Sequence, residues 1–250
     1  MAKKLKEKLN ECELISIASI INQNSIIATS EKIGFVFPIH NWSLPKIVYD
    51  FVEKIDLSKT NYIFAVATKG GPFKQYVVPM MNELLKPKKK RLDAAAMIKV
   101  FSANIMGSHN PMHPKEKQEI RISNAELKLE KIAEKIRNNQ KGSNKQISIL
   151  PLKKWYTSFL EKVNTLDKEY YVDEKCNGCG TCQRICPINN IKIVNEKPEW
   201  QHQCILCLGC LHYCPLGAIQ YGKYTPGRER YNHPNIKLKE LINQSNKIPI

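Results

Sequence analysis

Four stretches of the chain have the apolar pattern of β-strands. Three of them, residues 33–37, 62–68 and 94–101, are almost continuously apolar and are followed by Pro, Gly or polar residues. Continuous apolar runs of this length are typical of strands covered on both faces, as in a parallel sheet. A shorter run at 13–17 is predicted to form a further strand.

Between these strands, apolar residues recur at helical spacing. Residues 43–55, 73–85 and 122–136 repeat them every three or four positions, which predicts amphipathic helices, and a Lys- and Leu-rich helix is predicted over 2–10. Strands that alternate with helices indicate a parallel sheet with helices on both faces. The front of the chain is therefore predicted to be an α/β domain.

The composition adds a strong positive charge to this picture. Apolar residues make up 42% of the 250 residues, and the net charge is +16. No run approaches the roughly 18 apolar residues of a membrane span, and we find no signal peptide, so a cytoplasmic protein is expected. The dense basic run at 86–91 follows a predicted helix, and we interpret it as a solvated connector rather than a nucleic-acid contact.

A change to polar residues with Gly and Ser near 139–151 indicates a linker. We therefore predict four parts. The α/β domain covers 1–142, a linker and bridging helix cover 143–169, a cysteine-rich domain covers 170–222, and a basic tail covers 223–250.

The cysteine-rich domain contains the most specific motif of the sequence. Two runs of the form C-x2-C-x2-C-x3-C-P begin 28 residues apart and use eight of the nine cysteines. The runs consist of Cys176, Cys179, Cys182 and Cys186, and of Cys204, Cys207, Cys210 and Cys214. This spacing is the ligand pattern of bacterial ferredoxins that hold two [4Fe–4S] clusters.

In that pattern the fourth cysteine of each run ligates the other cluster. One cluster is then expected to take Cys176, Cys179, Cys182 and Cys214, and the other Cys204, Cys207, Cys210 and Cys186. A structural zinc site would use two C-x2-C pairs, and disulfides would need an oxidising compartment. Because each iron has a cysteine ligand, the domain is predicted to transfer single electrons and not to bind substrate.

The loops that follow the predicted strands are the second candidate site. In α/β sheets, ligands bind at the carboxyl ends of the strands, here at 38–42, 68–71 and 104–109. Trp42 and the glycines after the second strand would accommodate a planar ring such as a flavin. A tryptophan that caps the core explains the pattern equally well, and we expect structural roles for His40 and Cys12.

The chain resembles one family in four places. These are the strings F-V-F-P-I-H-N-W-S-L-P-K-I-V and Y-I-F-A-V-A-T-K-G-G, the doubled cysteine run, and the tail G-K-Y-T-P-G-R-E-R-Y-N-H-P. Its members, from anaerobic bacteria and archaea, fuse a flavodoxin fold to a two-cluster ferredoxin. The resemblance implies a flavodoxin-like parallel sheet, a small α+β ferredoxin domain and FMN in the front half. The residues implied for the flavin ring are Pro38, His40, Asn41, Trp42, Thr68, Gly70 and Gly71.

The sequence departs from flavodoxins at its beginning. The family's first strand and phosphate-binding loop have no counterpart before the predicted helix at 2–10, so either the start codon is misassigned or the front domain is N-terminally truncated. In the flavodoxin strand order the missing strand lies between 13–17 and 33–37. Because FMN then lacks the N–H donors that hold its phosphate, we expect it to bind weakly or not at all.

Two hypotheses of function follow. The first is an electron-transfer protein that carries single low-potential electrons through two [4Fe–4S] clusters to or from redox partner proteins. The positive charge could attract acidic partners, although lysines dispersed on helix faces for solubility are the preferred explanation of it. The alternative is an oxidoreductase that depends on FMN and iron–sulfur clusters and acts on a small-molecule acceptor. We identify no catalytic acid–base pair, and nucleic-acid binding is not favoured.

Overall fold

A computed structural model describes residues 1–71, 75–107, 112–143 and 150–245 of the chain. The chain divides into two compact units. Unit 1 comprises Met1–Ile17, Gln23–Phe101 and His113–Phe159, and unit 2 comprises Ala18–Asn22, Ser102–Met112 and Leu160–Ile250. Each unit is therefore assembled from segments that are distant in sequence.

Unit 1 is built on a parallel sheet with the order β1-β2-β3-β4. Its strands are β1 (Lys32–Pro38), β2 (Tyr62–Lys69), β3 (Ala94–Lys99) and β4 (Gly142–Ser143). The register aligns Pro38 with Thr68, and Thr68 with Ile98, so the carboxyl ends of the strands lie along one edge of the sheet. The parallel α/β sheet predicted from the apolar runs is confirmed.

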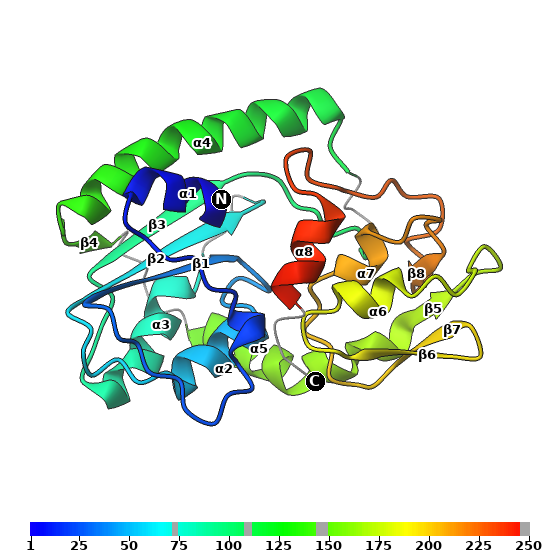
Figure 1. The fold of residues 1–250 in the computed structure, drawn as a ribbon, viewed down its shortest axis with the longest axis horizontal. Coiled ribbons are helices and arrows are strands. Elements are labelled where there is room, and N and C mark those ends of the chain that lie inside the picture. Colours follow the sequence, from blue (N-terminus) through cyan, green and yellow to red (C-terminus); the bar gives the residue numbers. More distant parts are fainter. Residues whose placement is uncertain (72–74, 108–111, 144–149, 246–250) are drawn as a thin grey trace. The chain divides into compact units, whose positions relative to one another are not determined.

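Helices cover both faces of this sheet (Figure 1). On one face lie α1 (Ala2–Leu9) and α4 (Lys115–Arg137), and on the other lie α2 (Lys46–Lys54) and α3 (Val77–Leu85). Side chains alternate along β2, so that Tyr62, Phe64 and Val66 share one core with residues of α1 and α4. Two further elements are α5 (Leu150–Lys162) and the 3-10 turn η2 (Lys86–Lys88).

Two expectations for unit 1 are corrected. Residues 13–17 form no strand and lead into the 3-10 turn η1 (Ile17–Ser19), while Leu14 and Ile15 are 42% and 50% exposed. The apolar pattern was misleading because a strand also needs a partner for its backbone groups. Strand β1 therefore lies at the edge of the sheet. Phe35 and Phe37 on one of its faces are buried, whereas Val36 on the other face is only half-buried, so burial on both faces is incomplete.

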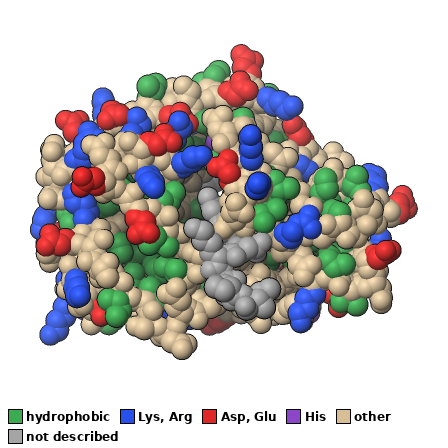
Figure 2. All heavy atoms as spheres, in the orientation of Figure 1, with side chains coloured by type: hydrophobic (Ala, Val, Ile, Leu, Met, Phe, Trp, Pro, Cys, Tyr) green, Lys and Arg blue, Asp and Glu red, His purple; other side chains and the backbone are tan. Residues whose placement is uncertain are grey.

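The basic run at 86–91 connects α3 to β3 through η2. Two of its side chains bind backbone carbonyls, since Lys88 Nζ donates to Glu53 O at 2.8 Å and Lys90 Nζ donates to Thr60 O at 2.7 Å. On the face of the molecule drawn in Figure 2, basic and acidic side chains are interspersed. Among the described residues, no helix has the length and apolar character needed to cross a membrane.

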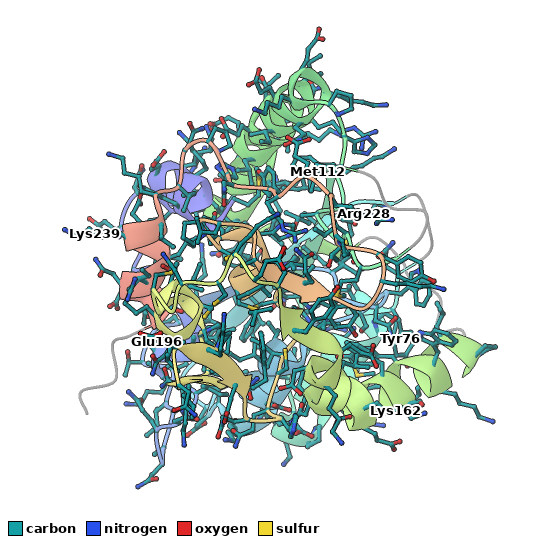
Figure 3. All side chains as sticks on the ribbon, turned by 90° about the vertical axis from the view of Figure 1, so that its right-hand side faces the viewer. Tyr76, Met112, Lys162, Glu196, Arg228 and Lys239 are labelled. Atoms are coloured by element: carbon teal, nitrogen blue, oxygen red, sulfur yellow. The ribbon has the colours of Figure 1, made fainter. Side chains whose placement is uncertain are left out.

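Unit 2 contains two antiparallel pairs of short strands. Strand β5 (Tyr170–Val172) pairs with β8 (Ile219–Tyr221), and β6 (Ile191–Val194) pairs with β7 (Lys197–Trp200) through the turn that carries Glu196 (Figure 3). The helices are η3 (Val163–Glu169), α6 (Thr181–Ile185), α7 (Gly209–His212) and α8 (Leu238–Ser245).

The segment between β3 and α4 belongs to unit 2. Ile105 is only 1% exposed within the core of this unit, and Arg228 Nη1 donates to the carbonyls of Ile105 and Gly107 at 2.8 and 2.6 Å. His212 Nε2 lies 2.8 Å from Ala103 O. Residues 104–107 of the candidate ligand loop at 104–109 therefore pack into the cysteine-rich unit. Residues 108–109 lie outside the described residues.

Candidate metal centre

Eight cysteine side chains of unit 2 line two separate hollows. The first hollow, of about 350 Å³ including open solvent, is lined by Cys176, Cys179, Cys182 and Cys214. The second hollow, of about 320 Å³, is lined by Cys186, Cys204, Cys207 and Cys210. Each hollow receives three cysteines from one run and the last cysteine of the other run. This is the grouping that the crossed ligand pattern requires.

The local backbone turns the thiols toward these hollows. The residues before α6 and α7, Gly180 and Leu208, adopt left-handed conformations with φ of 69° and 62°. Gly178 also has a positive φ, of 71°, and an added Cβ would lie 3.0 Å from Glu196 O. A side chain there would press on the turn between β6 and β7, so the loop around the first hollow needs glycine at this position.

Hydrogen-bond donors approach the sulfurs from the backbone. The N–H of Asn190 donates to Cys186 Sγ, and the N–H of Leu206 donates to Cys204 Sγ, both at 3.2 Å. In the first hollow, Thr181 Oγ1 lies 3.4 Å from Cys179 Sγ. Donors directed at sulfur favour the thiolate form that binds metal and tune the electron affinity of a cluster.

Burial sets the protonation of the free thiols. It raises the pKa of Cys182 to about 11 and that of Cys204 to about 12, although backbone N–H groups oppose the rise. Both side chains are therefore thiols at neutral pH in the absence of metal. Binding a metal displaces their protons, so the affinity of the site for metal increases with pH.

The residues present fit a [4Fe–4S] cluster in each hollow. Four thiolates complete the cysteine ligation of a cubane, and the remaining wall of the first hollow is largely apolar, with Ile193, Leu216 and Ile219. Within the described ranges, no three Cys, His, Asp or Glu side chains converge at the spacing of a single metal ion.

A buried polar network lies beside the second hollow. The fully buried carboxylate of Asp167 accepts a hydrogen bond from Asn190 Nδ2 at 2.8 Å, and its other oxygen lies 2.7 Å from His202 Nδ1. Burial is the largest cause that raises the pKa of Cys186 and of Cys204, and the charge of Asp167 raises both pKa values further. The sequence analysis missed this network, because nothing in the spacing of the cysteines indicates Asp167 or Asn190.

The first hollow has cations at its rim instead. Arg184 Nη1 donates to Cys179 O at 3.1 Å, and Lys197 Nζ donates to Cys176 O at 3.0 Å. Cys179 is exposed, and Leu216 beside it is 45% exposed. Two basic side chains and the apolar Leu216 therefore lie at the edge of the first hollow, together with Glu196 of the turn between β6 and β7. The ninth cysteine, Cys12, lies in unit 1, where its thiol donates to Glu13 O at 3.5 Å.

The candidate flavin residues lie together at the carboxyl edge of the sheet in unit 1. Pro38 ends β1 beside Thr68 of β2, and half-buried Gly70 and Gly71 follow β2. His40 and Ser43 close a tight turn with reciprocal backbone hydrogen bonds of 3.1 and 2.8 Å. The residues after Gly71, at 72–74, lie outside the described ranges.

That turn holds its two central residues in left-handed conformations. Asn41 has φ of 42° and Trp42 has φ of 65°, which is rare for a bulky side chain. The indole of Trp155, from α5, meets Trp42 edge-on with ring centroids 5.6 Å apart, and its N–H donates to Asn41 Oδ1 at 3.0 Å. Desolvation lowers the pKa of His40 to about 4, so this imidazole is neutral near pH 7.

Comparisons with known proteins found one family match and several similar proteins. Residues 175–219 match the family described as a 4Fe–4S dicluster domain. An uncharacterised protein of Methanocaldococcus jannaschii is 38% identical over 58 residues, which are 23% of this chain and 22% of that protein. The iron–sulfur subunit of the nitrate-inducible formate dehydrogenase of Escherichia coli is 32% identical over 78 residues, or 28% of this chain and 26% of that subunit.

The formate dehydrogenase iron–sulfur subunit of Haemophilus influenzae is 34% identical over 61 residues, which are 21% of this chain and 19% of that subunit. The chain thus spans about a quarter or less of the length of these curated relatives. No solved structure gave a significant match. The family match and the cysteine motif agree that residues 175–219 form a 4Fe–4S dicluster domain of the ferredoxin type.

Proposed function

We propose that this chain carries single electrons through two [4Fe–4S] clusters. The observation that supports this most strongly is the grouping of eight cysteines into two sets of four, with Cys186 and Cys214 exchanged between the runs. In this proposal each set ligates one cluster, and all irons have protein ligands. Such clusters exchange one electron at a time and leave no iron free to bind a substrate.

The electrons pass to or from a redox partner protein in this proposal. Relatives that are named as iron–sulfur subunits of formate dehydrogenases support a role beside a redox enzyme. The two cations at the edge of the first hollow, Arg184 and Lys197, would favour a partner that presents acidic side chains there.

Anaerobic reconstitution with iron and sulfide tests the ligand assignment. We expect about eight iron atoms per chain and an electron paramagnetic resonance (EPR) signal after reduction with dithionite. Replacing Cys12 with Ser is the matched control, because this cysteine lies outside both hollows and its loss should leave the iron content unchanged. A chain that takes up only zinc, or that shows no EPR signal when reduced, would contradict the proposal.

We propose further that the flavodoxin-like loops hold FMN weakly or not at all. The indole of Trp155 packs on Trp42 and engages Asn41, so a flavin ring stacked on Trp42 from that side would have to displace it. The purified chain should therefore lose added FMN on desalting. The Trp155→Ala variant removes the obstruction and should bind FMN at least as well as the unmodified chain.

Flavin retained stoichiometrically by the unmodified chain would instead favour the alternative function, an oxidoreductase dependent on FMN and iron–sulfur clusters. The strained turn at Asn41 and Trp42 is the observation in its favour, because such backbone strain is often found at ligand sites. Anaerobic assays of the reduced chain with quinones and nitroaromatic compounds separate the two functions. Turnover of a small acceptor supports the oxidoreductase, whereas reactivity toward redox proteins alone supports the carrier.

A further inference from the structure

Two buried hydrogen-bond donors beside the second hollow have no acceptor within the part of the chain that the structure describes. They are the hydroxyl of Tyr170 and the indole Nε1 of Trp200. Both residues line the second hollow, and Tyr170 is 7% exposed. Buried donors in proteins are nearly always paired, so an unpaired donor beside a ligand hollow indicates an acceptor that belongs to the ligand.

The ring of Tyr170 is held firmly in this position. It stacks on Trp200 with ring centroids 5.3 Å apart and an interplanar angle of 8°, and it meets Tyr221 edge-on at 4.9 Å. A tyrosine hydroxyl carries its proton at neutral pH, so it is a hydrogen-bond donor among the residues that line the second hollow.

The first hollow lacks this donor. The two cysteine runs are related by an offset of 28 residues, and 28 residues after Tyr170 the chain has Pro198. Pro198 lines the first hollow, where its ring offers no side-chain donor. The two halves of the repeat thus place a hydroxyl at one cluster position and an aliphatic ring at the other.

On the basis of the proposed clusters, we propose that the Tyr170 hydroxyl and the Trp200 indole N–H donate hydrogen bonds to sulfur atoms of the cluster in the second hollow. Reduction adds negative charge to the cluster and its sulfurs, and a donor stabilises that charge. The two residues therefore raise the midpoint potential of the second cluster and leave that of the first cluster unchanged.

The Tyr170→Phe variant tests this role, because it removes the hydroxyl and keeps the stacked ring. EPR-monitored redox titration should show the second cluster about tenfold harder to reduce, which for a one-electron couple is a shift of about −59 mV. Trp200→Phe should shift the same signal in the same direction. Tyr171→Phe is the matched control, since Tyr171 is the next residue of β5 and is 44% exposed. The signal of the second cluster is identified as the one that remains when Cys176, Cys179 and Cys182 are replaced by Ala.

Unchanged potentials in variants with both clusters assembled would overturn this inference and leave the proposed function standing. If the unmodified chain assembled no clusters, that result would instead contradict the proposed function. A second measurement needs no variant. Electron–nuclear double resonance of the reduced chain in D₂O should detect exchangeable deuterons coupled more strongly to the second cluster than to the first, and equal coupling would contradict the inference.

Discussion

Cys186 and Cys214 each end one cysteine run and line the hollow of the other run. This exchange makes the two halves of the repeat depend on each other, because neither set of four thiols is complete within its own half. Both cysteines also lie before a proline, Pro187 or Pro215, at a point where the chain leaves a short helix. The geometry of the exchange can be tested one residue at a time.

Removing the first run isolates the second cluster. With Cys176, Cys179 and Cys182 replaced by Ala, we expect the chain to bind about four iron atoms. Adding Cys186→Ser to this variant should disrupt the remaining cluster, whereas adding Cys214→Ser should leave its iron content and EPR signal unchanged. The opposite result would show that each run ligates its own cluster.

The buried Asp167 provides a second prediction at this scale. Its negative charge lies near Cys186 and Cys204, and a nearby negative charge disfavours the electron that reduction adds. Asp167→Asn removes the charge with little change of shape and should raise the midpoint potential of the second cluster by roughly tens of millivolts. The first cluster, titrated in the same sample, is the internal reference. Equal shifts of both clusters would mean that the substitution acts through the fold and not through the charge.

The cysteines could be found from the sequence because the spacing of cluster ligands is local. Asp167, Tyr170 and Trp200 could not be found in the same way, since each lies outside the two cysteine runs. A comparison of Tyr170 with Pro198 across the repeat was the one available signal. It becomes meaningful only when both residues are known to line a hollow.

At the scale of elements, the pairing of β1 with β2 depends on one glycine. Gly34 lies opposite Phe64 in the register, and a Cβ added to Gly34 would lie 2.0 Å from the tip of the Phe64 ring. The ring of Phe64 therefore fills the space beside the glycine backbone. This contact joins the edge strand to the core that β2 shares with α1 and α4.

Gly34→Ala should consequently destabilise unit 1 by about 1–3 kcal/mol, because the added methyl group overpacks this contact. Urea unfolding followed by circular dichroism measures the loss. The double variant Gly34→Ala with Phe64→Leu should recover part of it, since leucine leaves room for the methyl group. A single variant as stable as the unmodified chain would show that Phe64 moves aside at no cost.

The long helices and the three main strands were predictable because their apolar periodicity extends over many residues. Strand β4 was not, since its two residues lie within the predicted linker and carry no pattern of their own. The strand expected at 13–17 failed for the opposite reason, because an apolar pattern was present without a partner strand. The flavodoxin-like fold itself remains a prediction.

At the scale of the whole chain, unit 2 is held together by segments that are far apart in sequence. Arg228, in the tail, binds the carbonyls of Ile105 and Gly107, and His212 lies against Ala103. The domain boundaries near 142 and 169 were placed by composition alone and remain predictions. Composition could not indicate that residues 102–107 pack with the cysteine-rich unit, because such contacts depend on tertiary structure.

Arg228→Ala should weaken the packing between the tail and residues 105–107 of unit 2. It leaves two carbonyls without their charged donor, which we expect to destabilise unit 2 by about 2 kcal/mol. The visible absorbance of the clusters should then decay faster in air than in the unmodified chain. Lys223→Ala, at an exposed position of the same tail, should decay at the unmodified rate. Equal rates of absorbance decay for all three proteins would show that the hydrogen bonds of Arg228 do not protect the clusters.

A reductive titration that counts electrons per chain tests the central claim most directly. The anaerobically purified chain is reduced stepwise, and the electrons taken up are compared with the EPR spin count of the same samples. Two one-electron clusters without flavin should take up about two electrons per chain and give about two spins. Uptake of about four electrons per chain, with bleaching of a flavin band, would contradict the proposal that the chain is an electron carrier without FMN. No uptake of electrons would contradict the proposal that the chain holds two clusters.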